Sequence, residues 1–203
     1  FLRPDTVVSD VGSTKQSALA AFAEHLPQHL PQCVAAHPIA GSDRSGALAA
    51  QFGLYQDKKL ILCPHETQNP EAEALVGRLW QAVGAQIFRM SAQEHDAVFA
   101  AVSHLPHILA FAYVHQILDH ADGATYLDFA ATGFRDFTRI ASSHPAIWTD
   151  ICFANRDSLL KLLEGQQRQL EKIASLLRNG DSDGLYRYFA EAKQTRDDWL
   201  EQQ

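Results

Sequence analysis

Two loops of this 203-residue chain carry residue types suited to proton transfer, and each follows a short apolar run. The first loop, DVGSTK (Asp10 to Lys15), holds Ser13, and the second, HPIAGSDRSG (His37 to Gly46), begins with His37. A histidine titrates near neutral pH, and a serine hydroxyl beside it can orient the ring or bind a substrate oxygen. The structural alternative is that Ser13 caps a helix and His37 is an ordinary loop residue. Spacing alone leaves both interpretations open.

Three more histidines lie in the string HDAVFAAVSHLPH, namely His95, His104 and His107. His104 and His107 are three residues apart, so they share a face if the segment is helical. The N-terminus of a helix there would favour a nearby anion. These side chains could donate protons to a carboxylate or simply cap the helix, and spacing alone favours the caps.

A third cluster lies in GFRDFTRIASSHPAIWTDICFAN, from Gly133 to Asn155. Arg135 and Arg139 are four residues apart and therefore lie on one side of a helix. An arginine fork matches the geometry of a planar carboxylate. The alternative is that Asp136 and the two arginines form surface ion pairs, which contribute little to stability.

Metal chemistry is not expected, although the chain has ten histidines and three cysteines. The sequence shows no H-E-x-x-H, no C-x-x-C and no Cys/His quartet, which are the spacings typical of metal ligands. Cys33, Cys63 and Cys152 each lie in an apolar context, so we expect buried reduced thiols.

The elements that must position these clusters change character near residue 90. Before it, short apolar runs alternate with helical patterns, which indicates a parallel sheet with intervening helices. We expect strands at Thr6 to Asp10, Gln32 to Pro38, Lys59 to Pro64 and Gly84 to Met90. Ligands of such sheets bind beyond the carboxyl ends of the strands. The loops that carry Ser13 and His37 should therefore meet at one edge.

From Ser91 onward, apolar residues recur at helical spacing almost to the end. The segment Ser103 to Leu118 is apolar on most faces, so we expect it to be buried in a bundle or a subunit interface. Further helices are expected over 135–142, 146–155, 157–177 and 185–200. The predicted fold class is α/β followed by all-α. A truncated Rossmann-like parallel sheet forms residues 1–90, and a helical substrate-binding and dimerisation domain forms residues 91–203.

The composition excludes two classes of partner. With 17 Lys and Arg against 24 Asp and Glu, the net charge is -7, and no basic stripe offers a nucleic-acid site. The longest apolar stretch, Ile108 to Val114, is far shorter than the ~20 residues that span a bilayer, and no secretory segment opens the chain. We expect a cytoplasmic protein.

Five strings in this order, DVGSTK, HPIAGSDRSG, HD-x6-SHLPH, DFTRIA and P-x-x-W-x-DI-x3-N, resemble the prephenate dehydrogenase family over roughly Asp10 to Asn155. The resemblance implies oxidative decarboxylation, in tyrosine biosynthesis, of prephenate to 4-hydroxyphenylpyruvate or of arogenate to tyrosine. It further implies NAD as the cofactor, with NADP not excluded, and tyrosine as a candidate feedback ligand, although no residue of the sequence decides whether tyrosine inhibits. The apolar segment Ser103 to Leu118 in turn predicts a homodimer.

The family pattern, carried over by residue, makes His37 the catalytic base for the ring hydroxyl. Ser13 would position that hydroxyl and the nicotinamide, Arg139 would grip a substrate carboxylate, and His107 would line the side-chain end of the pocket. The remaining expected contacts are Ser42, Trp148 and Asp136 for substrate, Asp10 for cofactor, and an Asp43–Arg135 ion pair as a gate, with Asp136 also steadying Arg139.

One departure from the family is serious. The family opens with a strand and a G-x-G-x-x-G turn that holds the cofactor pyrophosphate at a helix N-terminus, whereas the only early glycine here is Gly12. We therefore expect this chain to be a fragment that keeps much of the substrate pocket and loses most of its cofactor affinity.

Two other interpretations stay open. A different β-hydroxyacid-type dehydrogenase would share the architecture, but those enzymes usually depend on a lysine of the helical domain, whereas His37 and SHLPH hold the chemistry here. The chain could also be a structural, dimerising module without catalysis. Binding of substrate or product would separate the module from the enzyme.

Overall fold

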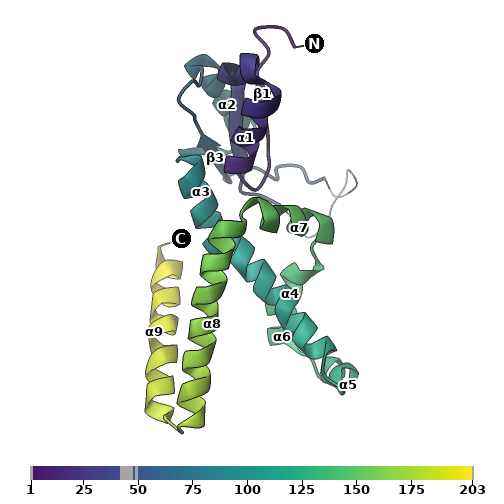
Figure 1. Ribbon diagram of the computed structural model, residues 1–203, viewed down its shortest axis with the longest axis vertical. Helices are drawn as coiled ribbons and strands as arrows, with labels where there is room; N and C mark the ends of the chain where they lie inside the picture. Colours follow the sequence, from purple (N-terminus) through teal and green to yellow (C-terminus); the bar gives the residue numbers. More distant parts are fainter. Residues whose placement is uncertain (1, 42–47, 49, 203) are drawn as a thin grey trace. The chain divides into compact units, whose positions relative to one another are not determined.

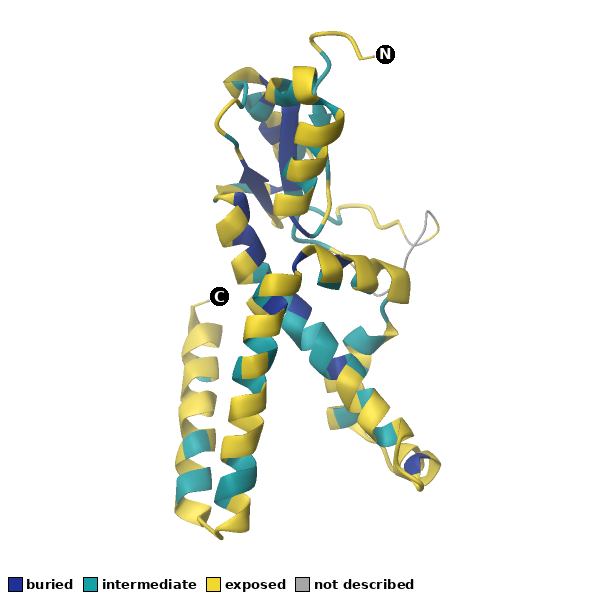
Figure 2. Cartoon of the chain, in the orientation of Figure 1, coloured by how far each residue is buried: buried dark blue, intermediate teal, exposed yellow. Residues whose placement is uncertain are grey.

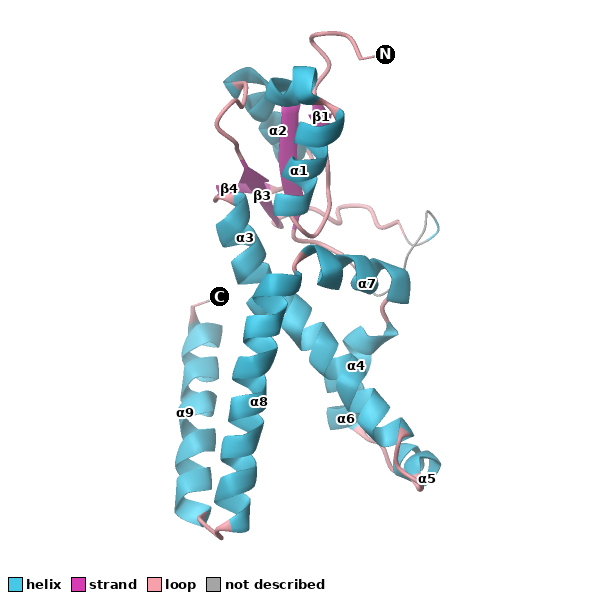
Figure 3. Ribbon diagram, viewed as in Figure 1, coloured by secondary structure: helices cyan, strands magenta, loops and turns pink. Residues whose placement is uncertain are grey.

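The computed structural model describes residues 2–41, 48 and 50–202. The chain divides into two compact units, Phe1–Leu159 and Leu160–Gln203. All four strands belong to the first unit (Figures 1 and 3). An α/β part followed by helices is therefore confirmed.

The sheet consists of β1 (Val8–Ser9), β2 (Cys33–Pro38), β3 (Lys59–Cys63) and β4 (Gln86–Arg89), in that spatial order. Each falls inside a predicted strand. The pairs β1–β2 and β3–β4 are parallel. Because β1 and β2 are parallel, the loops that follow them leave the sheet at the same edge, as the sequence predicts.

The pair β2–β3 is antiparallel, with His37 opposite Ile61, so the prediction of a wholly parallel sheet is wrong at this pair. A parallel return needs a crossover, usually a helix. The segment between these strands shows no α-helix in its described residues, and it turns back through Gly53 and Asp57, both with positive φ.

Helices cover both faces of the sheet. On one face, Val34, Ala36, Leu60 and Leu62 pack with residues of α2 (Pro70–Ala82). On the other, Ala35, Ile61 and Cys63 pack with residues of α1 (Gln16–His25) and α3 (Ala92–Phe99). The buried strands are the dark layer of Figure 2. Side chains alternate along a strand, so His37 lies on the same face as Ala35, toward α3.

A helix of 27 residues, Ala92–Leu118, continues from the sheet. It consists of α3, a π-helical turn (Ala100–His104) and α4 (Leu105–Leu118). The expected burial on all sides is not found within the chain, since Ala110 is the buried residue of α4 and Leu118 is 61% exposed. By length and composition alone this helix could also cross a membrane, and 17% of its apolar window is buried. The composition of this helix does not show whether lipid or protein covers its apolar surface.

Short helices complete the first unit. They are η1 (Pro27–Gln32), α5 (Gly123–Asp128), α6 (Thr132–Thr138), η4 (Arg139–Ser142) and α7 (Pro145–Ala154). The helix expected over 135–142 is divided at Arg139, where α6 gives way to the 3-10 turn η4.

Most of α8 (Arg156–Arg178) and all of α9 (Ser182–Glu201) form the second unit, a helical hairpin. The predicted break between them is confirmed. Gly180 has a positive φ there, and the Asp181 carboxylate caps α9 by accepting from Gly184 N at 2.8 Å.

Candidate active site

A cavity of about 800 Å³ lies in the first unit, within the size range of small-molecule sites. Its wall comes from the loop after β1, the end of β2, the helix α3–α4, and the segment η4–α7. It brings together five residues to which the sequence assigned a role: Ser13, His37, His107, Arg139 and Trp148.

The other assigned residues that the structure describes, Arg135, Asp136 and Asp10, are not among the lining residues. Ser42 and Asp43 lie outside the described residues. Arg135 and Asp136 are exposed on α6 and are not among the lining residues. Within the described part of the chain, no ion pair joins Asp136 to an arginine, so neither the steadying of Arg139 nor the alternative of surface pairing is observed there.

Asp10, assigned to the cofactor, is engaged inside the protein. Its carboxylate accepts hydrogen bonds from Gly12 N and Ala36 N, each at 2.9 Å, and pairs with the Lys15 ammonium. Lys15 is fully buried and also donates to the Ala36 carbonyl at 2.6 Å. Burial lowers the pKa of Lys15, and Asp10 opposes that shift. Asp10 therefore shapes the loop that carries Ser13, and its contact with a cofactor stays a prediction.

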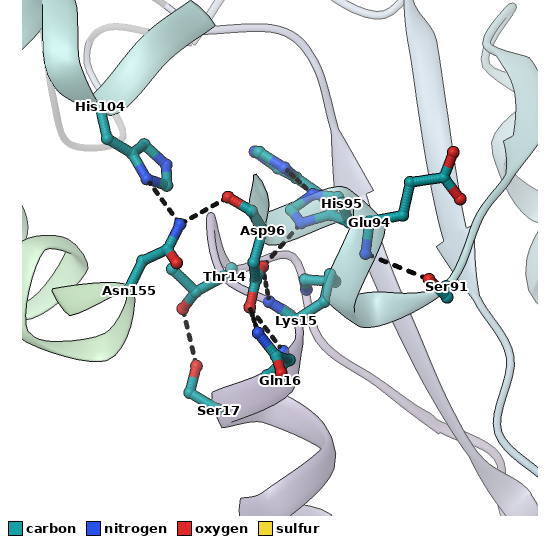
Figure 4. A network of polar contacts seen from close by, with 12 residues as sticks. Thr14, Lys15, Gln16, Ser17, Ser91, Glu94, His95, Asp96, His104 and Asn155 are labelled. Atoms are coloured by element: carbon teal, nitrogen blue, oxygen red, sulfur yellow. Dashed lines mark hydrogen bonds and ion pairs between the residues drawn. The ribbon is translucent and has the colours of Figure 1, made fainter. Parts of the chain in front are cut away.

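His37 is held by a chain of hydrogen bonds that ends in a buried carboxylate. Its Nδ1 lies 2.8 Å from Nε2 of His95, and Nδ1 of His95 lies 2.8 Å from Oδ1 of Asp96. Figure 4 shows His95 and Asp96 side by side on α3. His95 and Asp96 are both fully buried. The Phe99 ring packs against the His37 ring, with ring centroids 5.0 Å apart. Because Nδ1 of His37 is engaged, Nε2 is the ring nitrogen that can meet a ligand.

Burial lowers the pKa of His37 to about 3, and the nearby His95 and Lys15 act in the same direction. The ring is therefore neutral at physiological pH. A neutral imidazole has the free lone pair that a general base needs, and a pKa nearer the operating pH, which is the ideal for such a base, would require a bound ligand to change the surroundings of the ring.

Asp96 also caps helix α1. Its Oδ1 accepts from Lys15 N at 2.7 Å, and its Oδ2 accepts from Gln16 N at 3.0 Å. The alternative that Ser13 caps this helix is therefore wrong, since the cap comes from α3. Burial alone would raise the pKa of Asp96, but the hydrogen bonds that it accepts, from His95 first, lower it on balance.

Sequence reasoning assigned no role to Asp96 and left His95 among possible caps. The adjacent pair His95–Asp96 was visible in the motif that begins with HD. Nothing local signals that this acid reaches Lys15 and Gln16, which are about eighty positions away.

Asn155 joins this network from the end of α7. Its Nδ2 donates to the Asp96 carbonyl at 2.7 Å and lies 3.3 Å from Nδ1 of His104. Both residues appear in Figure 4. His104 is 1% exposed, and burial lowers its pKa to about 4.

The far wall of the cavity is aromatic. The His107 ring stacks on Trp148 with centroids 3.6 Å apart, and His107 Nδ1 donates to the Ser103 carbonyl at 2.8 Å. Burial lowers the pKa of His107, and Arg139 acts in the same direction. In the neutral ring, Nε2 of His107 is left to accept a hydrogen bond.

The charge of the cavity favours an anion. The described lining residues include Arg139, three histidines and four serines, and none of them is an aspartate or glutamate. The cavity therefore suits an acid with a flat hydrophobic body and a hydroxyl.

The described residues offer neither a metal site nor a free helix N-terminus at α1 for a phosphate. Over residues 2–41, 48 and 50–202, no three His, Cys, Asp or Glu side chains are grouped to hold a metal ion. The N-terminus of α1 does not serve a phosphate, because Asp96 already occupies the N–H groups of Lys15 and Gln16.

Comparisons with known proteins match both parts of the chain to one family. Residues 1–89 match the family model described as "Prephenate dehydrogenase, nucleotide-binding domain", and residues 91–191 match "Prephenate dehydrogenase, dimerization domain". The chain is 40% identical over 195 residues to prephenate dehydrogenase of Bacillus subtilis, covering 95% of this chain and 52% of that protein. It is 33% identical over 197 residues to cyclohexadienyl dehydrogenase of Zymomonas mobilis, covering 96% and 67%.

A solved structure is similar as well. Prephenate dehydrogenase from Aquifex aeolicus, in complex with hydroxyphenyl propionate and NAD+, superposes with a TM-score of 0.89 at 34% identity, covering 97% of this chain and 68% of that one. The chain spans about half the length of the Bacillus protein and two thirds of the Zymomonas protein. With both of its parts matched, and at these identities, this chain belongs to the prephenate dehydrogenase family.

Proposed function

We propose that this protein catalyses the oxidative decarboxylation of prephenate, or of arogenate, in tyrosine biosynthesis. The observation that carries the proposal is His37, whose Nδ1 lies 2.8 Å from Nε2 of His95, in the same cavity as Arg139 and with no carboxylate among the described lining residues. Residues 1–90 would form the nucleotide-binding part, and residues 91–203 the substrate-binding and dimerising part.

His37 would first accept a proton from the substrate and later return it to the product. Nε2 takes the proton of the ring hydroxyl while the carbinol carbon loses hydride and becomes a carbonyl. The bond to the ring carboxylate then breaks, carbon dioxide leaves, and its electron pair completes the aromatic ring. His37 returns the proton to the phenolic oxygen, so the histidine ends as it began. A nicotinamide dinucleotide supplies the hydride acceptor when it is bound.

Substrate binding would be divided between charge and stacking. Arg139 forms charge-assisted hydrogen bonds with a substrate carboxylate. His107 and Trp148 line the end that receives the side chain, where a keto acid differs from an amino acid. Ser42 and Asp136 are proposed as further contacts, and Asp43 with Arg135 as a gate.

The residues of this chain fit only one end of the cofactor. Ser13 lines the cavity beside His37, where it can contact a nicotinamide. For the pyrophosphate end, the sequence contains no G-x-G-x-x-G, and Asp96 fills the N-terminus of α1. NAD is proposed over NADP because the similar Aquifex structure contains NAD+.

Assembly and regulation belong to the same proposal. The match of residues 91–191 to a dimerization domain supports a homodimer, and the exposed apolar surface of α4 offers an interface. Tyrosine is proposed as a feedback ligand because it shares the aromatic ring and side-chain carboxylate of the products. The proposed location is the cytoplasm.

Isothermal titration calorimetry with 4-hydroxyphenylpyruvate and with tyrosine tests the pocket without needing turnover. We expect binding to the unaltered chain, and a loss of about 10- to 100-fold in Arg139→Ala, as for a hydrogen bond to a charged group. Arg78→Ala removes the same charge from the exposed surface of α2 and serves as the matched control. Equal affinity in all three proteins would overturn the assignment of the carboxylate site.

A further inference from the structure

We propose that Asp96 is a positioning residue: through His95 it fixes the His37 ring so that Nε2 is the bare nitrogen offered to the substrate hydroxyl. The inference rests on the proposed function for its purpose. Its physical content, the location of two protons, can be measured independently of that function.

The direction of the hydrogen bonds follows from what each group can do. An ionised carboxylate only accepts, so His95 must donate from Nδ1 to Asp96. A neutral His95 then has a bare Nε2, which accepts from its neighbour 2.8 Å away. His37 must therefore donate from Nδ1, and its proton-free nitrogen is Nε2.

Asp96 is itself held in a fixed orientation. Oδ1 accepts from Lys15 N as well as from His95, and Oδ2 accepts from Gln16 N at 3.0 Å and from Gln16 Nε2 at 3.2 Å. Four donors therefore hold two oxygens of a fully buried side chain. Rotation of the Asp96 carboxylate would break several of these hydrogen bonds at once. Its fixed position therefore also fixes the orientation of the His95 ring.

The groups around His37 favour its neutral form. Burial is the main cause, and the Lys15 ammonium, which faces the ring from the start of α1, opposes a positive charge on it; His95 faces the ring from α3 and His104 from the π-helical turn. Asp96 is the acid that acts in the other direction, and it is separated from His37 by one imidazole. The arrangement keeps His37 able to accept a proton at neutral pH.

The same carboxylate also places Ser13. Asp96 caps α1 at Lys15 and Gln16, directly after the turn that carries Ser13. One side chain of α3 thus sets the position of both groups proposed to meet the substrate hydroxyl, although they come from different strands. Asn155, which binds the Asp96 carbonyl, holds this anchor from α7.

Histidine tautomers in the 15N-labelled chain provide the first test. Long-range 1H–15N correlation spectra, assigned by single substitution of each histidine, distinguish Nδ1–H from Nε2–H. We expect Nδ1–H for both His37 and His95 in the unaltered chain. Nε2–H on His37 would overturn the proposal.

Asp96→Asn should reverse the chain of hydrogen bonds. If the amide oxygen keeps the cap at Gln16 N, the NH2 group faces His95, which must then accept at Nδ1. His95 becomes the Nε2–H form and donates to His37, which in turn carries its proton on Nε2. The control is Gln16→Ala, which removes one donor to the same carboxylate and should leave both tautomers as they are.

Ligand binding shows whether the tautomer matters to the site. The unaltered chain should bind 4-hydroxyphenylpyruvate about 2- to 10-fold more tightly than phenylpyruvate, the worth of one neutral hydrogen bond. Asp96→Asn should lower that ratio, because His37 would then donate to the hydroxyl and a phenolic hydroxyl accepts a hydrogen bond less strongly than it donates one, while Gln16→Ala keeps the ratio. A variant that weakens both ligands equally and keeps the ratio would show a merely structural role and overturn the proposal.

The two proposals fail in different ways. If the tautomers are as expected and neither acid binds, the proposed function fails and the proton arrangement stands. If both acids bind, Arg139→Ala weakens them, and His37 carries Nε2–H, the positioning role fails alone.

Discussion

Acidification should destabilise this protein well above the pH at which most carboxylates become protonated. His37 and His104 are held neutral by burial, which lowers the pKa of His37 to about 3 and that of His104 to about 4. In the unfolded chain the pKa of each histidine returns to about 6.5. Between pH 6.5 and these lower values the unfolded state binds more protons than the folded state, so the free energy of unfolding falls as the pH falls.

The size of the effect follows from the same values. At pH 5, protonation of one histidine of pKa 6.5 stabilises the unfolded state by about 2 kcal/mol relative to pH 8. His104 is 1% exposed, so the full value applies. His37 is half-buried and partly screened, so about 1 to 2 kcal/mol is appropriate. The sum, about 3 to 4 kcal/mol, is a large part of the roughly 5 to 15 kcal/mol of a typical domain.

Urea unfolding at pH 8, 6 and 5, followed by circular dichroism at one fixed protein concentration, measures this loss. His104→Gln cannot be protonated and should reduce the loss by about 2 kcal/mol. The double variant with His37→Asn should remove most of it. If the double variant keeps the full dependence on pH, these two histidines are not its source and the reasoning is refuted.

Three further perturbations test separate contacts. Asn155→Ala leaves the Asp96 carbonyl and His104 Nδ1 without their donor, and should lower the free energy of unfolding by about 2 to 4 kcal/mol in urea titrations; a loss below about 0.5 kcal/mol would contradict the network. Trp148→Ala removes the aromatic wall and should weaken 4-hydroxyphenylpyruvate about 2- to 10-fold in calorimetry, whereas unchanged affinity would place the ligand elsewhere. Leu118→Asp puts a charge on the exposed surface of α4 and should shift sedimentation equilibrium toward monomer; an unchanged dimer would mean that its interface excludes this residue.

Local patterns predicted the elements well because their causes are local. The strand β2 was expected at Gln32 to Pro38 and is found at Cys33–Pro38. Helix α2 begins at Pro70, where a proline suits the first turn and Asn69 caps it by accepting from Glu71 N. The meeting of Ser13 and His37 in one cavity followed from the parallel pairing of the strands before them.

Features that depend on distant parts of the chain were harder to predict. The direction of β3 depends on how the chain returns after His37, and a run of short apolar strands does not show that the crossover helix is missing. The segment Ser103 to Leu118 was expected to be buried because it is apolar on most faces. Within this chain most of its residues are instead half-buried, and Tyr113 and Leu118 are among the exposed ones. Its burial in a subunit interface stays a prediction.

Asp96 shows why the centre of the site needed coordinates. In the sequence it follows a histidine within a helix, a context in which an acid is normally solvated. Its importance comes from burial and from donors on α1, whose N-terminus would otherwise leave backbone N–H groups unpaired. A buried carboxylate is stable only when donors surround it, and those of Asp96 include the histidine that orients His37. The donors that stabilise the buried Asp96 carboxylate therefore include the one that orients the proposed base. A substitution of Asp96 should change both the stability of the fold and the positions of the histidine protons.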